Sequence, residues 1–353
     1  MSAPRGEPVA EALSPTIHRP ETIEDLAELL RKQSDSREAV AIVGSGSHRW
    51  MGSPPNFESV IEMGGFAGVR VFEPDDLTVV VGAGTAIGDL EGELAEGGKT
   101  AVLPESDPIA TIGGVISSGA SGYRRARFGP TRDRVLEVTA VTGDGRAIRS
   151  GGRVVKNVTG YDLPRLYTGS FGSLGVIESV CLKLWPLPER TVTVTVEDPE
   201  RAVELVHRPL AMLDVSGEYR VMLAGTAPAV EGEAKNLGGV IVEGFDWPQR
   251  PDSGVRTEVR VPPARIDDVV SNLHSDYIAQ IGVGVVETTV EEVSAVNDLR
   301  SEVESWGGVV LVEGGRGIDP WGTPPPTLNL QRRVIAEFDP HRILEPGRLP
   351  GGI

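Results

Sequence analysis

The chain has 353 residues, of which 39% are hydrophobic and 24% charged, a composition typical of a folded protein with a substantial core. Asp and Glu outnumber Lys and Arg by 51 to 34, and the formal charge of −17 would repel a phosphate backbone or an anionic lipid surface. No stretch approaches the roughly 18 apolar residues of a membrane-spanning helix. We therefore expect no nucleic-acid partner and no direct membrane insertion.

Cysteine usage and the first residues bear on the compartment. A single cysteine, Cys181, excludes an internal disulfide, a Cys-based zinc site and an iron–sulfur cluster held by this chain alone. The opening residues, MSAPRGEPVAEALSP, lack the apolar core of a signal peptide. We expect a cytoplasmic location, with any membrane association made through partners.

The first half of the chain combines helices with short apolar strands that run into glycine turns. The segment PETIEDLAELLRKQ predicts a helix, because its apolar residues recur at helical spacing after a capping threonine. A second helix, closed by glycine, is predicted in DLEGELAEGG. Buried strands are predicted in AVAIVG, VIEM, LTVVVGAG, LEVTAVTGDG and GVIESVCLKLWPL.

The pattern changes after Pro186 and Pro188. Strict alternation in TVTVTVE predicts a half-buried strand, and DPERAVELVHRPLAML predicts a helix that its internal proline shortens or kinks. Further strands are predicted in EYRVMLAG, GGVIVEGF, TEVRVP, IGVGVVET and GGVVLVEG, and helices in ARIDDVVSNLH and EEVSAVNDLRSEVESW. This succession predicts an antiparallel sheet covered by helices on one face.

Glycine clusters are the main candidates for a ligand site. GAGTAIG (82–88) resembles a dinucleotide fingerprint, but its third glycine comes one position late, which favours a strand-end turn over a Rossmann site. GSGSHRWMG (44–52) follows a predicted strand and offers successive backbone N–H groups to a pyrophosphate. PESDPIATIGGVISSGASGYRRARFG (104–129) is either an ordinary loop or a backbone laid flat against a large planar or phosphorylated ligand. KNVTGYDLPRLYTGSFGSLGVIESV (156–180) adds two more glycine-lined turns.

Several of these motifs, in this order, resemble a known family. They are P-x-x-x-x-x-x-T-I-G-G (104–114), FGPTRDRVLEVTAVTGDG (128–145), KNVTGYDL (156–163), GSFGSLGVIESV (169–180) and FDPHRILEPGR (338–348). Over nearly the whole chain they resemble the FAD-linked oxidases of the vanillyl-alcohol oxidase and p-cresol methylhydroxylase type. Within that superfamily, the short substrate-side domain and the closing segment resemble the FAD-binding subunits of bacterial glycolate oxidases.

The resemblance implies an α+β fold, with a two-lobed FAD-binding domain of the p-cresol methylhydroxylase type and a small α+β cap domain. Residues 1–190 would form the FAD-binding domain as two α+β lobes, residues 191–318 the cap, and residues 319–353 a return to the FAD-binding domain. The implied cofactor is FAD. Noncovalent binding is expected, because His48 falls about two positions beyond the position that carries the flavin-linking histidine in tethered relatives.

The resemblance also implies cofactor contacts in the glycine clusters. The pyrophosphate loop would be Gly44, Ser45, Gly46 and Ser47. Residues implied to run along the isoalloxazine and diphosphate are Pro104, Thr111, Ile112, Gly113, Gly114, Gly119, Ala120 and Gly122, while the backbone of Val176 and Ile177 would meet the adenine. Two side chains common in relatives are absent, an asparagine where Gly119 stands and a glutamate where Phe171 stands.

Candidates for chemistry are side chains expected near the flavin, where a cation stabilises the negative charge of the reduced ring. Lys156 and Tyr161 are the candidate catalytic residues, with Arg124 and Arg153 behind them. The alternative is that these side chains hold a domain interface by ordinary ion pairs. No metal site is expected, because the five histidines are scattered and the motif H-x-G-D-G-N-x-H, found in relatives that oxidise 2-hydroxy acids unaided, is missing.

The resemblance implies a flavoprotein subunit of a multi-subunit 2-hydroxy-acid dehydrogenase acting on glycolate or D-lactate. The implied partners are a second FAD-linked oxidase subunit and an iron–sulfur subunit, to which electrons would pass from the substrate by way of the flavin. Two alternatives stay open. One is a non-catalytic structural subunit of such a complex, and the other is a self-sufficient small FAD-dependent alcohol oxidase or dehydrogenase.

Overall fold

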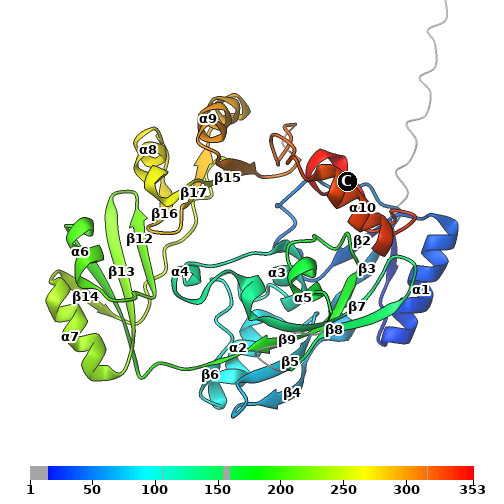
Figure 1. Ribbon diagram of the computed structural model, residues 1–353, viewed down its shortest axis with the longest axis horizontal. Helices are drawn as coiled ribbons and strands as arrows, with labels where there is room; N and C mark the ends of the chain where they lie inside the picture. Colours follow the sequence, from blue (N-terminus) through cyan, green and yellow to red (C-terminus); the bar gives the residue numbers. More distant parts are fainter. Residues whose placement is uncertain (1–14, 106, 154–159, 316) are drawn as a thin grey trace, which may run out of the picture.

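The computed structural model describes residues 15–105, 107–153, 160–315 and 317–353 (Figure 1). The chain builds two parts, each with its own sheets and hydrophobic core, and its last helix packs against the first part. No helix in these ranges is long and apolar enough to cross a membrane.

The first part contains a small parallel sheet and a larger antiparallel sheet. The parallel sheet has the order β1 (Thr16–His18), β3 (Ser59–Glu62), β2 (Val40–Val43). The antiparallel sheet has the order β4 (Val69–Glu73), β5 (Thr78–Gly82), β9 (Val176–Lys183), β7 (Val135–Val141), β8 (Ala147–Gly151). A short ladder joins β6 (Lys99–Thr100) to β10 (Trp185–Pro186).

Helices of the first part follow the sequence signals at their ends. Helix α1 (Ile23–Ser36) begins with a capping box, in which Thr22 accepts from the N–H of Asp25 and the Asp25 carboxylate accepts from the N–H of Thr22. Both predicted helices are confirmed, since α2 spans Ile87–Glu96 and ends at Gly97. Two shorter helices of this part are α4 (Arg125–Phe128) and α5 (Leu163–Tyr167).

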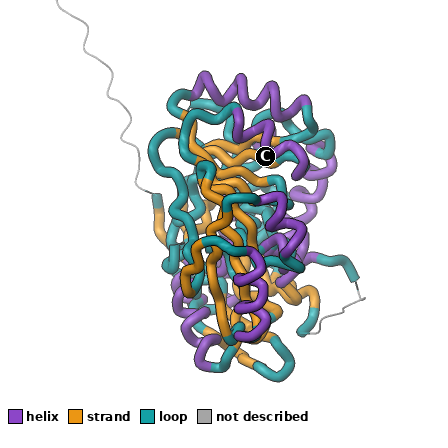
Figure 2. Tube along the Cα trace, turned by 90° about the vertical axis from the view of Figure 1, so that its left-hand side faces the viewer, coloured by secondary structure: helices purple, strands orange, loops and turns teal. Residues whose placement is uncertain are grey.

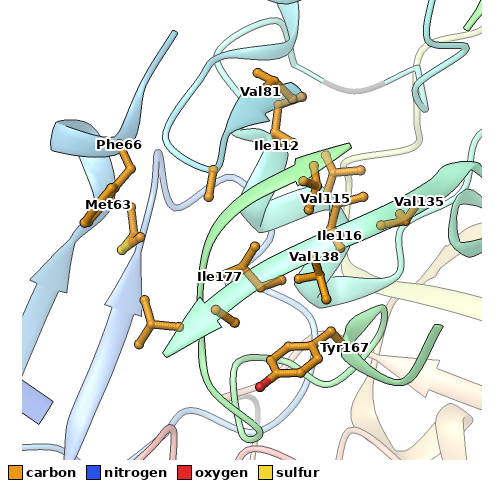
Figure 3. Close-up of a cluster of buried hydrophobic side chains, with 14 of the residues drawn as sticks. Met63, Phe66, Val81, Ile112, Val115, Ile116, Val135, Val138, Tyr167 and Ile177 are labelled. Carbon is orange, nitrogen blue, oxygen red and sulfur yellow. The ribbon is translucent and has the colours of Figure 1, made fainter. Parts of the chain in front are cut away.

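Helix α3 (Ile112–Ser118) lies inside the glycine-rich stretch 104–129 and corrects its interpretation. The glycine-rich pattern predicts a loop or a backbone laid flat against a ligand, whereas these seven residues form a helix. Ile112, Val115 and Ile116 recur at helical spacing and are fully buried in the core of the first part (Figure 3). Their burial outweighs the poor helix propensity of Gly113 and Gly114.

The second part is an eight-stranded antiparallel sheet. Its order is β14 (Val240–Glu243), β11 (Arg190–Val196), β13 (Glu218–Gly225), β12 (Ala211–Val215), β16 (Tyr277–Gln280), β17 (Val285–Val290), β15 (Val255–Arg260), β18 (Val309–Val312). Helices α6 (Pro199–Leu205), α7 (Ala227–Leu237), α8 (Ile266–Ser271) and α9 (Val293–Ser305) cover one face, as the two views show (Figures 1 and 2). The predicted helix-covered antiparallel sheet is therefore confirmed.

One strand prediction in this part is wrong at its start. The segment IGVGVVET was predicted as a single strand, but residues 281–284 form a turn and β17 begins at Val285. Gly282 and Gly284 have φ values of 77° and 85°, in the left-handed region that glycine adopts without a steric penalty. The glycines therefore mark the turn between β16 and β17.

The C-terminal segment returns to the first part and extends its small sheet. After α10 (Leu328–Phe338), the N–H of Val40 donates to the carbonyl of Ile343 at 2.7 Å, and the N–H of Glu345 donates to the carbonyl of Val40 at 2.9 Å. Strand β2 is thus held between β3 and the C-terminal segment, directly before the glycine cluster that starts at Gly44.

Candidate functional site

Strand β2 runs into a loop, Gly44–His48, whose backbone donors are free of protein partners. The chain turns at Gly46, with φ of 79°. Among the described residues, no protein group accepts a hydrogen bond from the backbone N–H of Ser45, Gly46, Ser47 or His48. Successive N–H groups of this kind form a concave anion site. The loop is therefore suited to a diphosphate.

The loop packs tightly against the start of α3. A Cβ atom at Gly44 would lie 2.1 Å from Oγ1 of Thr111, and one at Gly113 would lie 2.9 Å from Cβ of Ala83. At Gly114 a Cβ would lie 3.2 Å from Oγ1 of Thr111, a tight contact, but its next neighbour is Nδ1 of His48 at 4.0 Å, and Gly114 lines a pocket. Gly44 and Gly113 thus bring the backbones together, and Gly114 leaves room for a ligand.

These segments enclose what we call the loop pocket, with a volume of about 80 Å³. Eight of the predicted cofactor residues line it: Gly44, Ser45, Gly46, Ser47, Thr111, Gly113, Gly114 and Ile177. The loop pocket shares Ser118 and Phe171 with an interdomain cavity of about 680 Å³, which Gly119 lines. Ligand sites usually measure about 300–1,000 Å³, so the interdomain cavity has the size of a ligand site and the loop pocket alone is too small for a dinucleotide.

The other predicted cofactor residues do not line the loop pocket. Ile112 and Val176 are fully buried in the hydrophobic core. The carbonyl of Ala120 accepts from the Thr131 hydroxyl at 2.6 Å, and Gly122 packs against Pro104 and Glu105. For these residues a cofactor contact stays a prediction.

Neither candidate catalytic residue is brought to the loop pocket by the described part of the chain. Lys156 lies outside the described residues. Tyr161 is 89% exposed, and Arg153 is exposed as well. Arg124 donates to Glu105 at 2.6 Å and to the carbonyl of Leu103 at 2.6 Å, so its contacts are an ordinary ion pair and hydrogen bond within the first part. A catalytic role for Lys156 and Tyr161 stays a prediction.

Sequence reasoning missed a buried carboxylate on the loop pocket, Glu345. Its Oε1 accepts from the N–H of Ile42 at 2.6 Å and lies 3.4 Å from Arg49, and its Oε2 lies 3.7 Å from Arg348. Burial raises the pKa of Glu345, although both arginines oppose the shift. Glu345 thus ties the C-terminal segment to the strand that leads into the loop.

Phe171 also lines the loop pocket, where many relatives carry a glutamate. It packs under the guanidinium of Arg348, 5.7 Å from the ring centroid, and edge-on against Trp321 at 5.2 Å. An apolar and cation–π contact therefore stands at the position of the missing carboxylate.

A second missed group lies on the sheet face opposite the helices of the second part. We call it the cap cluster: Tyr123, Arg250, Arg256, Glu258, Arg260 and Glu287. Glu258 on β15 lies directly across from Glu287 on β17. Glu287 accepts from the Tyr123 hydroxyl at 3.2 Å and pairs with Arg250 at 2.8 Å, and Glu258 pairs with Arg260 at 2.6 Å. Burial, with Glu258 nearby, raises the pKa of Glu287 despite Arg250.

His48 lies between the loop pocket and the cap cluster. It lines the loop pocket, and its Nδ1 is 3.1 Å from the hydroxyl of Ser47. Burial and, to a smaller extent, the charge of Arg250 lower the pKa of His48 to about 4. The imidazole is therefore neutral at pH 7. Across the described ranges, no three His, Cys, Asp or Glu side chains come together as a metal site.

Comparisons with known proteins show which proteins the chain is similar to. A protein-family model described as "FAD binding domain" matches residues 15–151. The chain is 27% identical to glycolate oxidase subunit GlcE of Escherichia coli (strain K12), covering 92% of this chain and 96% of that protein. It is 26% identical to the D-lactate dehydrogenase of Archaeoglobus fulgidus, over 94% of this chain and 90% of that protein. Glycolate oxidase subunit GlcD of Bacillus subtilis is 28% identical, but the match spans 49% of its length.

Among solved structures, the chain is similar to an alkyldihydroxyacetonephosphate synthase, with a TM-score of 0.66 and 15% sequence identity. The match covers 94% of this chain and 75% of the synthase chain. This likeness confirms the predicted fold class, an α+β fold with an FAD-binding domain of the p-cresol methylhydroxylase type. Residues 15–151 are therefore an FAD-binding domain, the cofactor is FAD, and the homologues of the chain are glycolate oxidase subunits and D-lactate dehydrogenases.

Proposed function

We propose that this chain is the FAD-binding subunit of a multi-subunit 2-hydroxy-acid dehydrogenase acting on glycolate or D-lactate. In this proposal residues 1–190 and 319–353 hold FAD noncovalently, and residues 191–318 form a cap over it. Electrons leave through an iron–sulfur partner, and a second FAD-linked oxidase subunit completes the complex.

One observation carries the proposal: the similarity to the glycolate oxidase subunit of E. coli runs through nearly the whole of both chains. A shared cofactor domain alone would match only part of each. The second part of this chain, with its cap cluster, is therefore included in the similarity. The single cysteine supports a partner that supplies the iron–sulfur ligands.

The residues of this chain have separable tasks in the proposal. The free N–H groups of Ser45, Gly46, Ser47 and His48 would hold the diphosphate. Gly114 leaves space beside Thr111, and Glu345 fixes β2 so that the loop keeps its shape. When bound, FAD supplies the two-electron acceptor for oxidation of the hydroxyl-bearing carbon. The neutral imidazole of His48, beside Ser47, remains unlinked to the flavin.

The decisive experiment is anaerobic reduction of the purified chain. We expect a yellow protein whose colour passes fully into the supernatant on acid precipitation, because the cofactor is not covalently bound. Bleaching by glycolate or D-lactate should occur when the two partner subunits are present. A colourless chain in a fully active complex would instead favour a structural subunit. Robust turnover by the isolated chain would favour a self-sufficient oxidase or dehydrogenase.

Complex formation is tested separately. Co-expression with the candidate iron–sulfur and second flavin subunits, followed by size-exclusion chromatography, should give one peak that contains all three chains. A standard interface would bury about 800 Å² on each partner. Elution of this chain as an independent monomer under all conditions would reject the complex.

A further inference from the structure

The cap cluster borders a small cavity of about 30 Å³ that is separate from the loop pocket. The cavity is lined by Trp50, Arg250, Pro251, Arg256, Thr257, Glu258, Glu287 and Thr288. It lies close to the flavin site along the chain, because His48 lines the loop pocket, Trp50 the small cavity and Met51 the interdomain cavity. Residues 48–51 therefore connect the walls of the small cavity to the walls of the proposed cofactor site.

The charges around this cavity leave one arginine without a counter-ion. Glu287 is paired with Arg250 and Glu258 with Arg260. Arg256 forms no ion pair with any residue in the described ranges, and its guanidinium lies 6.0 Å from the ring centroid of Trp50. Three arginines thus face two carboxylates, in a chain whose net charge is −17. One added monoanion would balance the cluster.

Arg250 is held in place but remains accessible. Its Nε forms an ion pair with Glu287 at 2.8 Å, while 41% of its side-chain surface stays open. The Tyr123 hydroxyl donates to the same carboxylate, and the Tyr123 ring stacks on Trp247 with centroids 5.7 Å apart. Tyr123 and Glu287 therefore act as positioning residues, and they leave guanidinium donors of Arg250 available for a ligand.

The size of the cavity limits the ligand. A volume of about 30 Å³ holds about two waters, which is room for part of a carboxylate group, so the rest of a bound acid would lie outside the cavity. Planar guanidinium groups bind carboxylates through paired N–H donors. The chemistry of the cavity therefore matches one carboxylate group.

We propose that the small cavity of the cap cluster is the substrate carboxylate site, in which Arg256, together with Arg250, binds the carboxylate of a 2-hydroxy acid as small as glycolate or lactate. The proposal rests on the proposed function, because it assigns the substrate a place beside the FAD site. It replaces Lys156 and Tyr161 as the first residues to test for substrate recognition.

The test measures binding without turnover. Oxamate, a small monoanion that cannot be oxidised as a 2-hydroxy acid, is titrated into the FAD-loaded chain by calorimetry and by tryptophan fluorescence, since Trp50 lines the cavity. Arg256→Gln should weaken oxamate binding at least about tenfold, with unchanged FAD content. The matched control is Arg190→Gln, which removes an exposed, paired arginine near the far edge of the same sheet and should bind as wild type does.

A second variant tests the planar donors of Arg250, and a neutral ligand tests whether binding requires a negative charge. Arg250→Lys retains the charge but loses the planar donor pair, and should weaken oxamate binding about threefold to tenfold. The neutral analogue oxamide should be insensitive to both variants. Failure of the yellow wild-type chain to bind oxamate, or equal binding by Arg256→Gln, would overturn the carboxylate site. Arginine-dependent oxamate binding without bleaching by any 2-hydroxy acid in the complex would instead refute the proposed function and leave the site standing.

Discussion

Gly44 and Thr111 approach each other so closely that a Cβ atom at position 44 would lie 2.1 Å from Oγ1 of Thr111. Cγ2 and Cβ of Thr111 would be 2.9 and 3.0 Å away, so rotation of the threonine side chain does not relieve the overlap. Thr111 also caps α3 by accepting from the N–H of Gly114. The position of the diphosphate loop and the start of α3 are therefore fixed by one contact.

Gly44→Ala should move the loop away from α3, lower the stability of the folded chain by about 1–3 kcal/mol and remove most of the FAD. Thermal unfolding and the absorbance of the purified protein measure the two effects. Gly92→Ala is the control, because a Cβ at Gly92 in α2 meets no atom within 4 Å. That variant should keep its FAD and gain slightly in stability. Full flavin occupancy in Gly44→Ala would refute the contact.

Gly114→Val should remove FAD while leaving the fold intact. A side chain at this position enters the open space of the loop pocket and meets only Oγ1 of Thr111 at 3.2 Å and the His48 ring at 4.0 Å. We expect circular dichroism like that of the wild type and flavin affinity reduced by more than about tenfold. Gly114→Ala, which adds one methyl group, should have an intermediate affinity. A valine variant that retains all its flavin would place the cofactor elsewhere.

His48 should make the folded state sensitive to acid. Burial lowers its pKa from the ordinary 6.5 to about 4, so between these values the unfolded chain binds a proton that the folded chain does not. Stability therefore falls as the pH drops from about 6.5 toward 4. Between pH 7.5 and pH 4.5 the free energy of unfolding should fall by about 1–2 kcal/mol less in His48→Gln than in the wild type. This figure is smaller than the full pKa shift implies, because His48 is only half-buried and solvent screens its charge. Urea unfolding at both pH values tests this, and equal losses in the two proteins would contradict it.

Glu345→Ala should be among the most damaging single substitutions in the first part. It leaves Arg49 and Arg348 without their shared counter-ion and the N–H of Ile42 without its acceptor. Removing one member of a buried charge group costs about 3–5 kcal/mol. Glu345→Gln keeps an oxygen for Ile42 and should cost less. Denaturant midpoints rank the three proteins, and an alanine variant as stable as the glutamine variant would show that the Ile42 contact contributes nothing.

Cys181 should be inert to thiol reagents in the folded chain. Its side chain is 1% exposed on β9, and burial raises its pKa to about 11. At pH 8 a disulfide reagent such as Ellman's should react only after denaturant is added, with one thiol titrated per chain. Rapid reaction of the native protein would mean that β9 opens readily.

Helices and strands were predictable where their apolar residues recur with a single clear period or where a capping residue marks their start. TVTVTVE alternates and forms β11, and the capping threonine before IEDLAELL starts α1. Helix α3 was missed because its two glycines lower the intrinsic helix propensity, whereas the burial of Ile112, Val115 and Ile116 is a tertiary effect. The start of β17 was missed because Gly282 and Gly284 continue an apolar alternation although they form a turn.

In the candidate site, too, only the local features could be predicted from the sequence. The loop Gly44–Ser47 is local, and a glycine-rich run after a strand is visible in the sequence. Contacts between distant residues are not visible. Glu345 meets the N–H of Ile42 across 303 positions, and Tyr123 meets Glu287 across 164 positions. A single sequence does not show which partner a carboxylate meets in the fold, so neither Glu345 nor the cap cluster could be distinguished from ordinary surface charge.

The contact of Val40 with Ile343 and Glu345 sets an order of events during synthesis. Strand β2 leaves the ribosome early, but its neighbour on one side belongs to the segment that leaves about 300 residues later. We therefore expect the nascent chain to wait with an incomplete sheet and to take up FAD only after residues 343–348 have emerged. Ribosome-bound chains stalled before Ile343 should carry no flavin, whereas the released full chain should acquire it. Cofactor loading would then serve as a late checkpoint that only fully translated protein passes.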